Sequence, residues 1–358
     1  MPMPEVLRVG DSAVLEHDRS DMSGSNFVKY YSVADRTICI KGPDEPILNL
    51  AHEFLGGYYI TATRSSGTGA APVHLIELHK TVPPVLPASE PGFEIEDGHC
   101  FMSGEQIVLE VNGSTLVVGP PETQRTDIWL SETTSARHEL ALNNVILYAV
   151  QAALRRAGLF QFHAGCVLPE DSSQAILIVG DSGSGKSTLT VALLQNGWRF
   201  VTDDNLLLSE SPDAVEAWAL RRYFTFDETT IRDCKLTAFP DSIGGRIPGK
   251  LEKFRFYARQ AFPEKFVDRC VPGAILFPTI SDEPKSRIEP LNQLDALTRL
   301  IRQCPWATCD AAAAPHHLQA LSKLAKQTRS YKLFAGRDVI ESPAAVAQLI
   351  KEQADNLS

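Results

Sequence analysis

The segment AILIVGDSGSGKSTLTVALLQNGWRFVTDD, residues 175–204, decides the fold of this 358-residue chain. It begins with an apolar run, Ala175 to Val179, which predicts a buried strand. The octet GDSGSGKS, Gly180 to Ser187, comes next, and Thr188 to Asn196 then follows a helical pattern. A glycine-rich turn between a strand and a helix is the context that a Walker A phosphate-binding loop requires. The segment therefore predicts a nucleotide-binding α/β unit.

The residue types of this octet suit the binding of a triphosphate. Glycines let the backbone turn so that successive N–H groups point inward, and the start of the helix adds its positive end. Lys186 is expected to reach the β- and γ-phosphates of ATP, and the Ser187 hydroxyl to ligate Mg²⁺. The expected nucleotide-binding residues are Gly180, Asp181, Ser182, Gly183, Ser184, Gly185, Lys186, Ser187 and Thr188.

An acidic pair, Asp203-Asp204, ends the second strand-like segment, Trp198 to Thr202. The two strands of a right-handed strand–helix–strand unit are parallel, so their carboxyl ends share an edge and the pair is predicted beside the loop. Asp203 is expected to hold Mg²⁺ together with Ser187, and Asp204 to accept the proton of an attacking hydroxyl. The reverse division stays open, because the sequence does not say which carboxylate faces the metal.

Three motifs, FHAG at Phe162 to Gly165, GDSGSGKSTL and GWRFVTDDN, resemble the HPr kinase/phosphorylase superfamily over residues 160 to about 205. The resemblance implies an α/β P-loop core of the HPr kinase/phosphoenolpyruvate carboxykinase type, with phosphoryl transfer from ATP to a serine hydroxyl. It also implies that His163 orients an Asp of the pair or touches the γ-phosphate, while a structural histidine is the alternative. The expected catalytic residues are Lys186, His163, Asp203 and Asp204.

The sequence departs from bifunctional HPr kinases at two places. Thr188 stands where those enzymes usually carry Glu, and no arginine-bearing segment associated with phosphorolysis follows Asp204. The chain is more similar to divergent HPr-kinase-related proteins, some of which phosphorylate natural-product precursor peptides such as those of lasso peptides. We therefore expect an acceptor serine on a peptide or an HPr-like small protein. A small-molecule kinase acting on free serine, a carboxykinase-like activity and a non-catalytic ATP-binding regulator are the alternatives.

Composition narrows the partners and the compartment. A formal net charge of −10 argues against general binding of nucleic acid or membrane surfaces. No run of about eighteen apolar residues exists, and residues 1–5 lack the order of a signal peptide, so we expect a cytoplasmic protein. Seven scattered cysteines without a CxxC pair predict free thiols. We also expect the protein to form a homo-oligomer.

The pattern of turns and periodicities predicts two domains, a β-rich accessory domain at residues 1–130 and a kinase domain at residues 131–358. The Asn112-Gly113 pair between two strand-like runs predicts a hairpin with a type I′ turn. The helical segment Ser135 to Ala157 is expected to begin the kinase domain.

Three polar segments further along the chain allow more than one interpretation. Arg221 and Arg222 suit either a surface strand or a grip on transferred charge or substrate. Gly244 to Arg259 predicts a glycine-rich basic loop followed by a helix, solvated or closing over the triphosphate or an acidic peptide. His316-His317 is expected at the surface.

Overall fold

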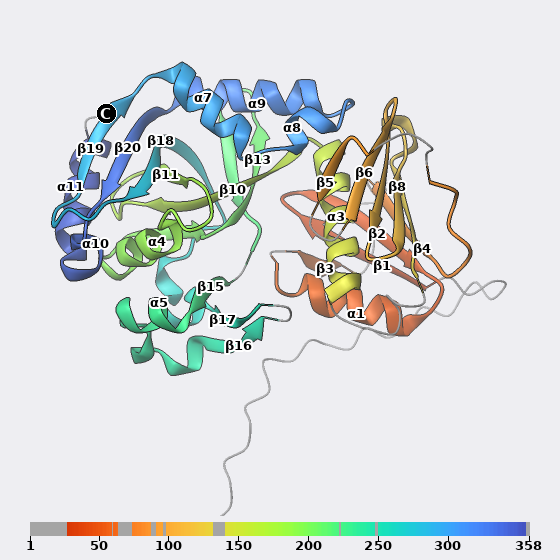
Figure 1. The fold of residues 1–358 in the computed structure, drawn as a ribbon, viewed down its shortest axis with the longest axis horizontal. Coiled ribbons are helices and arrows are strands. Elements are labelled where there is room, and N and C mark those ends of the chain that lie inside the picture. Colours follow the sequence, from red (N-terminus) through yellow and green to blue (C-terminus); the bar gives the residue numbers. More distant parts are fainter. Residues whose placement is uncertain are drawn as a thin grey trace, which may run out of the picture.

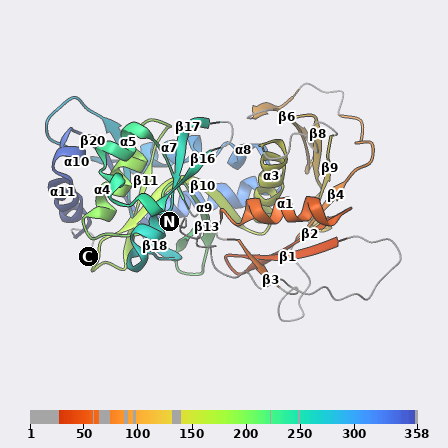
Figure 2. The same cartoon turned by 90° about the horizontal axis from the view of Figure 1, so that it is seen from below.

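The structure is a computed structural model that describes residues 27–58, 60–63, 74–86, 91–95, 98–131, 140–221, 223–247 and 250–355. Two units lie side by side (Figures 1 and 2). The first is built on a nine-stranded sheet, and the second combines an eight-stranded sheet, a three-stranded sheet and helices. The protein is therefore a mixed α/β protein, as the sequence predicts.

The first unit is a sheet covered by two helices. The strand order is β3-β1-β2-β4-β9-β8-β7-β6-β5. Its elements are β1 (Phe27–Val33), β2 (Arg36–Gly42), α1 (Glu45–Leu55), β3 (Thr61–Thr63), β4 (His74–His79), β5 (Phe93–Ile95), β6 (Gly98–Ser103), β7 (Gln106–Val111), β8 (Ser114–Val118), the 3₁₀ turn η1 (Pro121–Thr123) and β9 (Arg125–Trp129). Strand-like runs in the sequence predict seven of these strands, at residues 27–31, 37–40, 58–63, 73–79, 93–96, 107–111 and 114–118, and a short helix at residues 46–55, but they do not predict β6 or β9.

The β7–β8 hairpin shows why the short-range signal was reliable. Asn112 and Gly113 have φ values of 51° and 76°, so both central residues take the left-handed conformation of a type I′ turn. The flanking strands pair in register from Val111 with Ser114 to Ile107 with Val118. The predicted hairpin is confirmed.

Helix α3 (Leu140–Arg156) follows residue 130 but packs on the first sheet. Its buried residues, among them Val145, Ala149 and Ala153, share one apolar cluster with Ile40 and Ile76 of the sheet. The apolar face of this helix completes the core of the first sheet, and the same cluster includes Leu159 and Leu207 further along the chain. The predicted domain boundary at residue 130 stays a prediction.

The second unit contains the remaining elements. These are β10 (Leu159–Leu168), β11 (Gln174–Val179), α4 (Lys186–Gln195), β12 (Arg199–Thr202), β13 (Asn205–Glu210), β14 (Val215–Ala219), β15 (Phe224–Asp227), α5 (Glu228–Asp233), η2 (Leu236–Ala238), η3 (Pro240–Ser242), β16 (Ile243–Ile247), β17 (Lys250–Phe256), α6 (Ala258–Ala261), η4 (Pro263–Lys265), β18 (Arg269–Ile280), β19 (Arg287–Leu291), α7 (Gln293–Arg302), α8 (Trp306–Cys309), α9 (Ala314–Gln327), β20 (Arg329–Ala335), α10 (Asp338–Glu341) and α11 (Pro343–Asp355).

Strand β11 lies at the centre of this unit and is buried on both faces. Ala175, Leu177 and Val179 pack in the cluster that includes α7 and α9, whereas Ile176 and Ile178 pack in the cluster that includes α4 and α11. Alternate side chains of a strand point to opposite faces, which is why a strand between two helical layers reads as a continuous apolar run. Strand β11 pairs with β10 antiparallel and with β18 parallel.

The basic segment from Gly244 to Arg259 is not a flexible loop, contrary to the expectation. It forms β16 and β17 of the three-stranded sheet β15-β17-β16, followed by α6, with residues 248 and 249 outside the described part. Phe256 is fully buried and packs near Phe224 and Phe226 of β15. These aromatic residues pack the hairpin against α4. The glycines of the segment do not indicate this packing.

A buried ion cluster joins the two units. Asp310, which is fully buried, pairs with Arg155 (Nε to Oδ2, 2.7 Å) and Arg156 (Nη2 to Oδ1, 2.9 Å) at the end of α3. His317 lies in the same region, stacked on Phe160 with ring centroids 4.6 Å apart. The expectation of a surface position for His317 is wrong, because it is only 1% exposed and burial lowers its pKa to about 4.

Two general expectations concern the whole described chain. All seven cysteines are free, as predicted. None of the described helices has both the length and the apolar character that a bilayer crossing requires.

We expect Asp310→Ala to lower the free energy of unfolding by about 3–5 kcal/mol, because two buried guanidinium groups lose their counter-ion. Urea denaturation measures the change. The matched control is Glu228→Ala, which breaks an exposed pair with Arg246 and should cost less than about 1 kcal/mol. A loss for Asp310→Ala no larger than that of the control would contradict this assignment.

Candidate active site

The loop from Gly180 to Ser187, called the glycine loop below, connects the end of β11 to the start of α4. Gly183 and Gly185 have φ values of 81° and 90°, a conformation that favours glycine. Gly185 is the N-cap of α4 and offers no side-chain cap to the first amides of the helix. The positive end of α4 therefore faces the loop without a side-chain acceptor from its N-cap, as an anion-binding turn requires.

Lys186 is the buried cation of the loop, with 7% of its surface exposed. Its Nζ donates to the carbonyl oxygens of Gly180 (2.6 Å) and Asp181 (3.0 Å). Burial lowers the pKa of Lys186, while the nearby carboxylates of Asp204, Asp203 and Asp181 oppose this shift. Two backbone carbonyl groups thus hold the Lys186 ammonium group over the loop, and the carboxylates of the acidic pair are close enough to raise its pKa.

Asp203 and Asp204 interrupt what is otherwise one long edge of β10. Strand β12 pairs with residues 166–168 of β10, and β13 pairs with residues 159–163. The Ala164 N–H donates to the Asp204 carbonyl, and Ala164 also pairs with Val179 at the end of β11. Strands β11 and β12 are parallel, as predicted, but β10 lies antiparallel between them. Ala164 thus spans the gap between the glycine loop and the acidic pair.

Asp203 is buried and is bonded to the glycine loop. The Ser187 Oγ donates to Asp203 Oδ2 at 2.9 Å, whereas Asp203 Oδ1 is buried without a hydrogen-bond partner. Burial, together with repulsion from Asp204, raises the pKa of Asp203 to about 7, against the attraction of Arg221, Ser187 and Lys186. A buried carboxylate oxygen without a donor, next to a serine hydroxyl, fits the oxygen ligands that a hard divalent cation prefers.

Asp204 lies in a different electrostatic environment. Its Oδ1 lies 3.0 Å from His163 Nδ1, and its Oδ2 lies 2.6 Å from Arg221 Nη1. Burial on its own raises the pKa of Asp204, but Arg221, His163 and Lys186 outweigh burial and hold that pKa well below its usual range. The two adjacent carboxyl groups are therefore pushed in opposite directions, with Asp204 as the permanent anion.

Arg221 belongs to the site, although the sequence left open whether it is a surface arginine or a site residue. Its Nη2 lies 3.8 Å from Asp203 Oδ2, and its Nε donates to the Tyr223 carbonyl at 3.1 Å. Burial on its own lowers the pKa of Arg221. The attraction of Asp204 and Asp203 outweighs burial, so the pKa of Arg221 lies above its usual value. The signal for it was the RRYF segment after the acidic pair; Arg222 lies outside the described residues.

Close packing explains why the FHAG segment has a glycine at position 165. A Cβ at Gly165 would lie 2.6 Å from Thr190 Oγ1 of α4 and 3.1 Å from the Asp203 carbonyl. Both distances are shorter than ordinary contacts. Glycine therefore allows α4 and the acidic pair to approach β10 closely.

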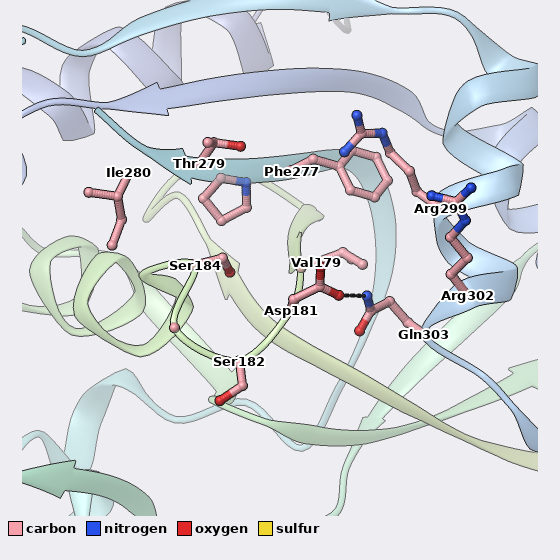
Figure 3. Close-up of a pocket in the computed structure, with 13 residues that line it drawn as sticks. Val179, Asp181, Ser182, Ser184, Phe277, Thr279, Ile280, Arg299, Arg302 and Gln303 are labelled. Atoms are coloured by element: carbon pink, nitrogen blue, oxygen red, sulfur yellow. Dashed lines mark hydrogen bonds between the residues drawn. The ribbon is translucent and has the colours of Figure 1, made fainter. Parts of the chain in front are cut away.

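A cavity of about 380 Å³ opens on the other flank of the glycine loop (Figure 3). Its lining residues are Val179, Gly180, Asp181, Ser182, Gly183, Ser184, Phe277, Pro278, Thr279, Ile280, Arg299, Arg302 and Gln303. Gln303 Nε2 donates to Asp181 Oδ1 at 2.7 Å, which fixes the wall of α7 to the loop. Neither acidic residue of the pair lines this cavity. The site thus has a cavity on one flank and the acidic pair on the other.

The predicted residues therefore fall into two groups. Lys186, Ser187, Asp203, Asp204 and His163 come together around the acidic pair. Asp181, Ser182 and Ser184 line the cavity instead, and Thr188 lies in the first turn of α4.

One further group of possible metal ligands, Glu77, His79 and Asp127, lies on the first sheet. Arg125 donates to Asp127 and pairs with Glu77, and His79 Nε2 lies 2.7 Å from Asp127 Oδ1. These carboxylates already have partners, so this group offers no comparable orphaned oxygen.

Comparison with known proteins gives little further guidance. No protein-family model matches the sequence, and no curated protein matches it. A solved structure, the Hpr(Ser) kinase/phosphatase from Coxiella burnetii, is similar to part of the chain, with 13% sequence identity and a TM-score of 0.28. The alignment covers 55% of this chain and 97% of that chain. At this level of similarity no residue role is transferred from that protein.

We expect Asp203→Asn to remove a pH-dependent loss of stability. Because the folded-state pKa of about 7 exceeds the ordinary 3.8, the folded protein binds this proton more tightly than the unfolded chain. The stability from this proton is complete below the unfolded-state pKa and is lost as the pH rises through about 7. In metal-free buffer, the difference in unfolding free energy, variant minus wild type, should increase as the pH rises to about 7 and should be constant above that pH.

The exposed residue Asp213 provides the matched control, because Asp213→Asn makes the same substitution at the surface, away from the acidic pair. Denaturant titrations from about pH 5 to 8.5 make the comparison. A constant difference between Asp203→Asn and wild type would mean that Asp203 is ionised throughout.

Proposed function

We propose that the protein is an ATP-dependent kinase that transfers the γ-phosphate to a serine hydroxyl of a peptide or small protein. The observation that carries this proposal is the buried Asp203 carboxylate beside the glycine loop, bonded to Ser187 through one oxygen and unpartnered at the other. A phosphate-binding turn and a cation site adjoin there, as phosphoryl transfer requires.

The donor side of the site suits Mg-ATP. The amides of the glycine loop and the first turn of α4 are suited to the phosphates, and Lys186 would exchange its carbonyl partners for phosphate oxygens. Ser187 and Asp203 would hold Mg²⁺, which neutralises phosphate charge when bound. Their fit rests on the orphaned Asp203 Oδ1.

The acceptor side is assigned to Asp204. Its carboxylate is an anion at neutral pH, and His163 and Arg221 fix its orientation. With a pKa this low it is a weak base, so it serves mainly to hold the attacking hydroxyl in line. In the reaction the serine Oγ–phosphorus bond forms, the bond from the γ-phosphorus to the bridging oxygen breaks, the hydroxyl proton passes to Asp204, and ADP leaves.

The fold supports the same proposal in its finer form, a P-loop core of the HPr kinase type. Strand β11, the glycine loop and α4 follow one another as that motif requires. An antiparallel strand, β10, lies between the two strands that carry the loop and the acidic pair and supplies His163. The common parallel order, in which those strands are direct neighbours, is absent in this described region.

The cavity beside the loop is proposed to receive the base and sugar of ATP. Its volume of about 380 Å³ lies within the range of small-molecule sites, roughly 300–1,000 Å³. Phe277 and Ile280 give it an apolar wall, and Arg302 gives it a cation (Figure 3). The nucleotide would thus enter from the β18 and α7 flank and leave the Asp204 flank to the acceptor.

We expect Lys186→Ala and Asp204→Asn each to lower phosphotransfer by about 10²- to 10³-fold or more, because each removes an aligned charge from the transfer site. The assay follows phosphate gain by mass spectrometry with Mg-ATP, offering HPr, serine-containing peptides and free L-serine. Asp204→Asn should retain ATP binding, and the exposed Lys326→Ala is the matched control.

Near-normal transfer by Lys186→Ala would contradict the assignment of the donor site. If wild type binds ATP tightly but transfers phosphate to no acceptor, the protein is instead a nucleotide-binding regulator.

We expect Arg302→Ala to raise the KM for ATP about five- to tenfold with little change in kcat, because it removes binding energy remote from the reacting atoms. Steady-state kinetics with varied ATP measures the effect. Arg337→Ala, which removes the exposed arginine just before α10, is the control. An unchanged KM would place the base and sugar elsewhere.

A further inference from the structure

We propose that Arg255 binds a carboxylate of the phosphate acceptor, so that the acceptor hydroxyl must have a carboxylate close to it. This inference rests on the proposed kinase function and specifies its substrate class. The argument begins with the small sheet β15-β17-β16, which lies beside the acidic pair.

The two faces of this sheet have different chemistry. Phe224 and Phe256 pair across β15 and β17 and point into the apolar core next to α4. Since alternate residues point to opposite faces, Tyr223, Arg255 and Tyr257 lie on the other face. The Tyr223 and Tyr257 rings are 6.1 Å apart, edge to face. This face therefore presents two tyrosines and an arginine outside the core.

Tyr223 links this face to the acidic pair. The guanidinium carbons of Arg221 and Arg255 lie 5.2 Å and 5.4 Å from the centre of its ring. Arg221 in turn contacts Asp204 at 2.6 Å. One aromatic ring thus separates the carboxylate that holds the acceptor hydroxyl from a second guanidinium group.

The two arginines differ in how their hydrogen bonds are satisfied. Arg221 is bonded to Asp204 and to the Tyr223 carbonyl. Arg255 is half-buried, its Nε is buried without a hydrogen-bond partner, and no carboxylate pairs with it among the described residues. A half-buried guanidinium group that lacks an anion is costly, and its planar fork matches a carboxylate.

The first unit adjoins the same place. Tyr58 forms an isolated antiparallel bridge with Arg221, and a Cβ at Gly57 would lie 3.2 Å from the Tyr223 ring. Tyr58 is buried, with 6% of its surface exposed. The accessory unit thus backs the ring that lies between the two arginines.

Arg255 lies away from the groups that are proposed to hold ATP, because Tyr223 and Arg221 stand between it and Asp204. The cavity beside the glycine loop is lined by the loop, β18 and α7, and by no residue of the small sheet. Arg255 lies on the acceptor flank, beyond Asp204 and Arg221. An extended peptide advances about 3.3–3.6 Å per residue, so a carboxylate within about three residues of an acceptor serine can reach it.

Phosphotransfer to matched acceptors tests the inference. The first pair of probes is a set of serine peptides with Asp, or with Asn, at each of the three positions on either side of the serine. The second pair is free L-serine and L-serinamide, which separates a carboxylate of a peptide from that of a free amino acid. Wild type should prefer the carboxylate member of one pair by about 10- to 100-fold in kcat/KM.

Arg255→Gln should reduce this preference to within about threefold, mainly by lowering kcat/KM for the carboxylate acceptor, and should leave the amide acceptor nearly unchanged. Arg246→Gln, which removes the same charge from the neighbouring strand, should retain the preference. Arg255→Lys keeps the charge without the planar fork and should retain part of it. Thermal melts of all three variants show that each is folded.

Each result decides a separate point. Transfer by wild type without any preference for a carboxylate, or a preference that persists in folded Arg255→Gln, overturns the role of Arg255 and leaves the kinase intact. A preference for L-serine over L-serinamide without transfer to peptides supports Arg255 and makes the substrate a free amino acid. The absence of transfer to all four probe classes and to HPr overturns the kinase and the carboxylate site together.

Discussion

Two adjacent carboxylates share one buried corner of this protein, and their mutual repulsion constrains everything around them. Neighbouring negative charges in a desolvated site do not both stay ionised unless cations are close. Arg221 and His163 contact Asp204 closely, whereas Asp203 has a serine hydroxyl and a more distant Arg221 nitrogen, 3.8 Å away, at one oxygen and no donor at the other. The corner is therefore asymmetric, with one fixed anion and one carboxylate that gains most from a cation.

That corner exists because one long β10 edge is interrupted. Strands β12 and β13 pair with the same edge of β10, and the Asp pair occupies the break between them. Ala164 bonds to the break on one side and pairs with the last residue of β11 on the other. Gly165, one residue further on, admits α4 at close range. The position of the acidic pair relative to the glycine loop is thus set by two consecutive small residues.

The sequence predicted the features that depend on short segments. The glycine loop and the β7–β8 hairpin follow from local patterns, whereas the position of His163 beside the acidic pair was expected from the resemblance of the FHAG motif. His317 and the packing of α3 did not, because each depends on contacts between residues far apart in the chain. Arg221 reaches Asp204 across the β13–β14 hairpin, but the sequence does not distinguish it from a surface arginine. The β16–β17 segment was predicted as a loop because it contains adjacent glycines. The aromatic residues of β15 that pack against it lie about thirty residues earlier, so a local pattern does not include them.

Two polar contacts link the two units, and one of them adjoins Asp204. At one point, Asp310 pairs with both arginines at the end of α3. At the other point, Tyr58 bridges to Arg221, the residue that holds Asp204. The apolar cluster around α3 also includes Leu159 and Leu207 of the second unit, so the two units share a buried interface besides these polar contacts. Tyr58 of the first unit and Tyr223 of the second unit therefore both adjoin Arg221, so the surroundings of Asp204 are built by both units.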